Sequence, residues 1–161
     1  MLAGANQPHK IVEDFLTEEP IRLAKTSNRW CAALIDFGIW FIIVAIITYC
    51  FGDVTTDEEG TQHFDLGGAQ GFFGMAIPWL ILLPLLEAIN HGQTIGKTIF
   101  KIRSAKKNGG NITTSAAFAR HLLDIVDYLP FFGIVGLLVA GNSQDKQRLG
   151  DMLAGTIVVA A

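Results

Sequence analysis

Residues 30–51 read WCAALIDFGIWFIIVAIITYCF, and Asp36 is the only charged residue among them. A helix needs about 20 predominantly apolar residues to cross the hydrocarbon core of a bilayer, so this stretch is long enough to span it. Trp30 and Tyr49 lie at or near its two ends, where aromatic residues of spanning helices meet the membrane interface. The stretch therefore predicts a membrane-spanning helix.

A second apolar stretch follows at residues 71–89, GFFGMAIPWLILLPLLEAI. It contains Pro78 and Pro84 and carries Glu87 near its end. Proline in a membrane helix frees backbone carbonyl groups, which neighbouring groups must then satisfy. We therefore predict a second spanning helix, kinked at its prolines and packed within a bundle.

The third apolar stretch, residues 115–141, is divided by Pro130 into an amphipathic part and a purely apolar part. As one helix it would cross the membrane, and as two short arms it would form a re-entrant hairpin. Residues 156–159 look like a β-strand, and a terminal strand needs a partner for its backbone groups. Residues 98–105 alternate like a strand and could pair with it. This need favours the re-entrant alternative, although both alternatives stay open.

The loops on the two sides of the second stretch differ in charge. Residues 52–70 form a polar loop without any Lys or Arg, whereas residues 90–114 contain five basic residues. Basic residues next to spanning helices mark the cytoplasmic side, so the second loop and the N-terminus are expected to be cytoplasmic. The chain accordingly divides into a polar cytoplasmic tail, residues 1–28, and a transmembrane domain, residues 29–161.

Together these stretches predict an all-α integral membrane protein, a small helical bundle of three apolar segments with a short cytoplasmic β-hairpin. Hydrophobic residues make up 50% of the 161, and the net charge of −3 offers no basic field for nucleic acid. The histidines and cysteines lack metal-ligand spacing, and no nucleophile motif stands out. We therefore expect no enzymatic activity, catalytic residue, metal, cofactor or nucleic-acid partner.

Three motifs, in this order along the chain, resemble the RDD family. They are NRWCAALID at 28–36, GQTIGK at 92–97 and QRLGDMLAGT at 147–156. The family is named for an arginine and two aspartates, which here look like Arg29, Asp36 and Asp151. The resemblance covers the transmembrane domain and implies a small multi-spanning protein of the bacterial cytoplasmic membrane. It implies either a role in sodium or proton antiport or a role as a partner in membrane protein assemblies.

Asp36 is the strongest single candidate for function. It lies about 9 Å into the first helix at about 1.5 Å per residue, and a charge in the membrane interior costs about 2.5–3.5 kcal/mol. Arg29 is two turns earlier on the same face and could extend toward it. Either Asp36 is a structural residue held by an arginine or by backbone donors, or it binds a proton or a monovalent cation.

Other ionisable residues are expected at a similar depth on the cytoplasmic side. Arg120 and Asp124 are four residues apart and can pair on one helical face, while Arg148 and Asp151 are three apart. The set forms either an interfacial salt-bridge network or an ion site in which an arginine competes with the proton or cation. The candidate residues are Arg29, Asp36, Glu87, Arg120, Asp124, Asp127, Arg148 and Asp151.

Two functions remain open on the sequence. The first is a cation/proton transporter that uses the membrane-embedded Asp36, with the lipid bilayer and a proton or monovalent cation as partners. The second is a non-catalytic accessory or assembly subunit of a larger membrane complex. So small a bundle has little interior for a solute path, which favours a homo-oligomer or a larger membrane-protein partner in either case.

Overall fold

The computed structural model describes residues 21–124, 127 and 133–161. Its two longest helices correspond to the first two apolar stretches. One is α2, Thr26–Phe51, and the other is a continuous helical rod, Gly68–Ile89. Among the described residues, these are the two helices that are long and apolar enough to cross a membrane. The protein is therefore mostly helical, with two candidate membrane-spanning helices.

The rod Gly68–Ile89 changes its hydrogen-bonding pattern partway along. It consists of α3 (Gly68–Leu80), the π-helical turn η1 (Ile81–Leu85) and α4 (Leu86–Ile89). Pro84 has no N–H to donate, and at Leu86 the N–H bonds to the carbonyl of Ile81, five residues earlier. The proline thus accounts for the irregular turn that the sequence predicts as a kink.

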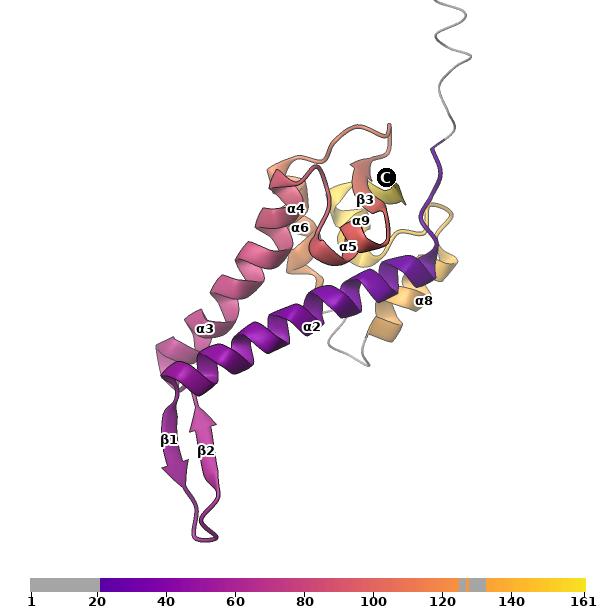
Figure 1. Ribbon diagram of the computed structural model, residues 1–161. Helices are drawn as coiled ribbons and strands as arrows, with labels where there is room; N and C mark the ends of the chain where they lie inside the picture. The colour runs from indigo at the N-terminus through magenta and orange to yellow at the C-terminus, as the bar shows by residue number, and fades with distance from the viewer. Residues whose placement is uncertain (1–20, 125–126, 128–132) are drawn as a thin grey trace, which may run out of the picture.

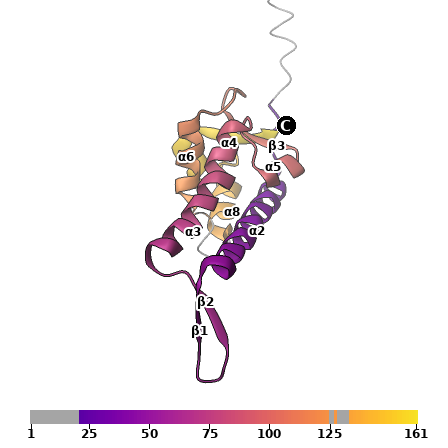
Figure 2. The same cartoon turned by 60° about the vertical axis from the view of Figure 1, so that its left-hand side comes forward.

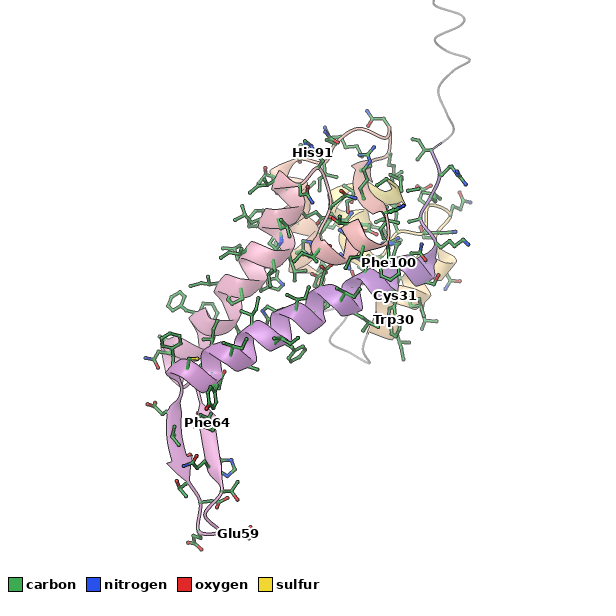
Figure 3. The ribbon with its side chains drawn as sticks, viewed as in Figure 1. Trp30, Cys31, Glu59, Phe64, His91 and Phe100 are labelled. Atoms are coloured by element: carbon green, nitrogen blue, oxygen red, sulfur yellow. The ribbon has the colours of Figure 1, made fainter. Side chains whose placement is uncertain are left out.

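A β-hairpin joins α2 to α3. Its strands are β1 (Asp53–Thr56) and β2 (Gln62–Asp65), paired antiparallel with Val54 opposite Phe64. Figure 3 shows Glu59 at its tip and Phe64 near its base, where the Phe64 ring lies 5.1 Å from that of Tyr49. From the sequence, this segment is predicted only as a polar loop. The hairpin is not predicted because every residue of both strands is exposed, so no alternation of apolar and polar residues marks them.

The predicted pairing of the C-terminal strand is confirmed. Strand β3 (Ile102–Lys106) pairs antiparallel with β4 (Thr156–Ala160), and Leu23 bridges to Val159 on the other edge of β4. The prediction that the first strand begins at Thr98 is wrong. Thr98 and Ile99 belong instead to helix α5 (Ile95–Ile99), whose N-terminus is capped by the Thr94 side chain.

The third apolar stretch contributes separate short helices. Helix α6 spans Thr114–Leu122 and α8 spans Ile134–Asn142, nine residues each. Pro130, where the sequence predicts a re-entrant turn, lies outside the described residues. After α8 comes α9 (Leu149–Ala154), which leads into β4. The C-terminal strand therefore lies beside residues 102–106, within the basic loop.

The two long helices are arranged as a wedge. They meet at the β1–β2 hairpin and diverge toward the opposite end, where α5, α6, α9 and β3 lie (Figures 1 and 2). His91 is located at that opposite end (Figure 3). The helices of the wedge expose large apolar side chains along their length, while its wide end buries charged groups. The exposed apolar residues include Phe41, Ile42, Ile46, Phe72, Phe73 and Ile77, and the largest fully buried side chains include Arg120, Glu87, Asp127 and Asp151.

Candidate functional site

The wide end of the wedge encloses a set of ionisable side chains that we call the ionic cluster. They come from α2, α4, α5, α6, the segment after α6, and α9 with its N-cap. Five carboxylates meet three arginines, one lysine and one imidazole, and every member except the partly buried Arg29 is buried. The ionic cluster comprises Arg29, Asp36, Glu87, Lys97, Arg120, His121, Asp124, Asp127, Arg148 and Asp151.

Asp36 attaches α2 to the start of α5. Its carboxylate accepts a 2.5 Å hydrogen bond from the Thr94 hydroxyl and a 2.7 Å bond from the Gly96 N–H. Thr94 Oγ1 in turn accepts from the Lys97 N–H, so one hydroxyl links the carboxylate to the cap of α5. Gly96 permits this contact because a Cβ there would lie only 2.1 Å from the Ala32 carbonyl oxygen.

We expect Gly96→Ala to separate α5 from α2. The new methyl group would overlap backbone atoms of Ala32, and overpacking of this kind costs about 1–3 kcal/mol. Gly38→Ala is the matched control. Gly38 lies in α2, and a Cβ there meets nothing within 4 Å. That variant should match or exceed the native stability. Unfolding in detergent micelles measures both, and equal effects would contradict the close contact between α2 and α5.

Glu87 lies at the centre of the ionic cluster. Its Oε1 accepts hydrogen bonds from Lys97 Nζ and Ser104 Oγ and lies 3.5 Å from Arg120 Nε, while its Oε2 lies 2.7 Å from His121 Nε2. Burial lowers the pKa of Lys97 to about 8, against the opposing attraction of the Glu87 carboxylate. The pKa of Lys97 therefore lies closer to neutral pH than that of an exposed lysine.

Asp151 joins three arginines. It pairs with Arg29, lies 2.9 Å from Arg120 Nη2 and 3.6 Å from Arg148 Nε, and accepts a hydrogen bond from the Arg148 N–H as a cap of α9. Burial alone would raise the pKa of Asp151, but Arg120, Arg29 and Arg148 outweigh it and hold that pKa well below the ordinary value. This carboxylate is therefore ionised at neutral pH and pairs with the arginines around it.

Asp124 and Asp127 connect the segment after α6 to α9. Asp127 accepts hydrogen bonds from the Leu149 and Gly150 N–H groups at 3.3 and 3.1 Å, as an anion at a helix start does. Asp124 lies 3.2 Å from Arg148 Nη2. A Cβ at Gly150 would lie 2.4 Å from the Arg120 carbonyl oxygen, so only glycine allows α9 to approach α6 this closely.

A small cavity of about 30 Å³ opens within the ionic cluster. Asp36, Lys97, His121, Asp124 and Arg148 are among its lining residues. A cavity of this size holds a water molecule or a bare monovalent ion, and it is too small for an organic substrate. The cavity therefore has room for a water molecule or a small cation among charged side chains.

The structure brings all eight candidate residues of the sequence analysis together, but several of their expected pairings differ. Arg29 pairs with Asp151 rather than extending to Asp36. Arg120 pairs with Glu87 and Asp151 instead of with Asp124, four residues later. The expected pairing of Arg148 with Asp151, three residues apart, does occur.

Sequence reasoning missed two members of the ionic cluster, Lys97 and His121. From the sequence, Lys97 is one of the basic residues that orient the chain and the last residue of the second motif, but it is not among the candidate site residues. His121 lacks metal-ligand spacing and was set aside on that ground, although its position three residues before Asp124 could have indicated a local pair. The side chains of Thr94 and Ser104 were missed as well, because their partners lie far away in the sequence.

Comparison with known proteins finds relatives over nearly the same residues as the three motifs. The sequence model of the RDD family matches residues 23–155, which include the whole ionic cluster. The uncharacterized protein YckC of Bacillus subtilis (strain 168) is 36% identical over 147 residues, covering 88% of this chain and 89% of that protein. No solved structure matches the chain.

Proposed function

The chain belongs to the RDD family, and from this premise we propose that it is an integral membrane protein that exchanges protons for monovalent cations. The proposed exchange takes place at the ionic cluster and uses Asp36. The family membership and the two apolar helices support the membrane location. The environment of Asp36 supports the exchange.

The distribution of apolar surface supports the membrane part of the proposal. Helix α2 has 26 residues, about 39 Å at about 1.5 Å per residue, which exceeds the thickness of a hydrocarbon core. Only 11% and 22% of the residues in the most apolar windows of the two helices are buried. The core helix of a soluble protein would be mostly buried. Such an exposed apolar surface is stable against lipid and unstable against water.

The proposed orientation follows the basic residues. The N-terminal end of α2, the loop 90–114 and the β3–β4 pair lie at the wide end of the wedge, and the acidic hairpin β1–β2 lies at the other end (Figure 1). The excess of Lys and Arg in residues 90–114 favours a cytoplasmic location for the wide end. In this arrangement two helices cross the membrane, α6 lies outside them, and the C-terminal strand returns to the cytoplasmic side.

The observation that carries the exchange proposal is the environment of Asp36. Among the described residues, it is the one carboxylate of the ionic cluster that makes no ion pair. Its hydrogen-bond donors, Thr94 and Gly96, are neutral, and it lines the small cavity beside Lys97 and His121. A buried carboxylate without a fixed counter-ion is stabilised by binding either a proton or a mobile cation.

The experiment is cation-driven proton flux in proteoliposomes, with the native protein compared with Asp36→Asn. We expect the native protein to move protons when sodium or potassium is added, and the variant to show only the background of protein-free vesicles. Asn has nearly the same shape but carries no charge to exchange. Asp65→Asn in the exposed hairpin is the control and should keep the native flux.

Folding must be measured in parallel because Asp36 also attaches α5 to α2. If Asp36→Asn has the native thermal stability and still exchanges at the native rate, Asp36 is not the exchanging group. If the native protein gives no flux while intact and correctly oriented, the exchange proposal is wrong.

A second candidate function is a non-catalytic accessory subunit that packs against another membrane protein. The observation that favours it is the wedge itself. The divergence of α2 and α3 leaves most residues of both helices unburied, so a second copy or a larger partner could cover them (Figure 2). Absence of flux, together with co-purification of a stoichiometric membrane protein from the native membrane, would support this function instead.

A further inference from the structure

His121 bridges two carboxylates through both nitrogens of its ring. Its Nε2 lies 2.7 Å from Glu87 Oε2 on α4, and its Nδ1 lies 2.5 Å from Asp124 Oδ2. The three side chains are buried, with side-chain exposures of 4%, 0% and 4% for His121, Glu87 and Asp124. We call them the bridging triad.

The bridge has a consequence for the number of protons in the triad. A neutral imidazole has one N–H donor and one bare nitrogen acceptor, whereas an ionised carboxylate can only accept. Two ionised carboxylates on one neutral ring would leave one nitrogen facing an oxygen with no hydrogen between them. Both contacts are satisfied when the triad holds one additional proton, with His121 as the imidazolium.

We propose that His121 is the proton carrier of the exchange, delivering the additional proton of the bridging triad to Asp36 across the cavity that both residues line. This inference rests on the proposed cation/proton exchange and extends it from one residue to a donor and an acceptor. In the step, one N–H bond of the imidazolium breaks and one O–H bond forms on Asp36. A positive and a negative group become two neutral groups, so net charge is conserved, and the neutralised Asp36 no longer attracts a cation.

The charged groups around the triad allow His121 to be either the imidazolium or the neutral imidazole. Asp36 faces it from α2, Lys97 from α5, Arg120 from its own helix α6, and Arg148 from the N-cap of α9. Burial disfavours the imidazolium, but Asp124 and Glu87 outweigh burial and raise the pKa of His121 above its ordinary value.

Charge balance in the ionic cluster points to the same proton as the one that is exchanged. With His121 as the imidazolium, the five cations of the cluster equal its five ionised carboxylates. Loss of this proton to the solvent would leave one uncompensated negative charge in a buried site, which an incoming monovalent cation neutralises. The group that changes its charge is then His121, while the arginines stay charged in every step.

The first measurement is the protonation state of His121 in the native full-length protein in lipid nanodiscs. Nitrogen NMR of ring-labelled histidine distinguishes imidazolium from each neutral tautomer. The signal that disappears in His121→Gln belongs to His121. We expect both ring nitrogens to be protonated at pH 7, with a titration midpoint above the ordinary histidine value of 6.5. A neutral His121 at pH 7 would overturn the proposal.

A second variant guards against misfolding of His121→Gln. Asp124→Asn keeps an oxygen acceptor for the ring but removes one negative charge, so the His121 midpoint should fall below its value in the native protein. If the midpoint does not move, the triad does not hold the proton and the proposal is wrong.

The second measurement is the pH profile of proton flux in proteoliposomes. We expect His121→Gln to lose the native pH dependence together with most of the flux, and His91→Asn to keep both. An unchanged profile in His121→Gln, with the native protein active, overturns the carrier role and leaves the exchange proposal intact. Absence of flux in the native protein, with a doubly protonated His121 by NMR, overturns the exchange and with it the carrier role.

Discussion

Replacement of Glu87 by Gln should cause one of the two largest losses of stability in this protein. The carboxylate accepts from Lys97 and Ser104, lies 3.5 Å from Arg120 and contacts His121. Gln keeps the volume but removes the charge, and its amide group would meet an N–H of the imidazolium or of a cation. Removal of one partner from a buried ion pair costs about 3–5 kcal/mol because it leaves an uncompensated buried charge.

Unfolding of the purified variant by a denaturing detergent measures this loss. Glu59→Gln at the tip of the hairpin is the matched control, since it makes the same chemical change on an exposed side chain and should alter stability little. A rise in pH should partly rescue Glu87→Gln, because Lys97, whose pKa is already lowered to about 8 in the native protein, becomes neutral. A variant as stable as the native protein would show that Glu87 does not hold the wide end together.

The helices were predictable from sequence because the signal for them is local. The stretch 30–51 has the length and composition of a spanning helix on its own, and 71–89 has the same property despite Pro78 and Pro84. The C-terminal strand was predictable for a similar reason, since β-branched residues 156–159 are typical of a strand. These predictions needed no knowledge of any distant residue.

The start of β3 and the outer hairpin could not be predicted, for two different physical reasons. Residues 98–105 alternate in polarity like a strand, but the Thr94 cap and the Asp36 carboxylate stabilise the helical turn α5, which includes Thr98 and Ile99. The outer hairpin has no buried face, so its strands are marked by turn chemistry alone. There Asp57 accepts hydrogen bonds from the N–H groups of Glu59 and Thr61.

The members of the candidate site were largely predictable, but their partners were not. A charge that lies in or beside an apolar stretch is conspicuous in the sequence, and six of the eight candidate residues were identified in that way, whereas Arg148 and Asp151 belong to the third motif. Their partners depend on contacts between distant segments, such as Arg29 with Asp151, which are 122 residues apart. The local rule that pairs residues four apart selected Asp124 for Arg120, but the tertiary contacts to Glu87 and Asp151 prevailed.

The glycines of two motifs acquire a physical explanation from the same contacts. Gly96 and Gly150 lie where a helix approaches backbone carbonyl oxygens of a neighbour, at Ala32 and Arg120 respectively. Each glycine is adjacent to, or one helical turn from, an acid or base of the ionic cluster. The motifs therefore bring segments close enough for their charges to meet, which suggests that the glycines and the charged residues serve one structural purpose.

The other prediction with a large expected effect concerns Asp151, whose replacement by Asn should destabilise the protein by about 3–5 kcal/mol at neutral pH. The variant would leave Arg29 and Arg120 facing a neutral amide in a buried site. Asp145→Asn is the control, because Asp145 pairs with Lys107 at the surface, where such a pair contributes little.

The dependence on pH gives this prediction a second readout. The pKa of Asp151 is lowered by folding, so its contribution to stability is complete above the ordinary value of 3.8 and is lost as the pH falls toward the folded-state pKa. Native stability should therefore decline on acidification below that value more steeply than the stability of Asp151→Asn, and the two curves should converge. Parallel curves would contradict the role of Asp151 as the anion that the three arginines share, and would locate the acid sensitivity in another carboxylate of the ionic cluster.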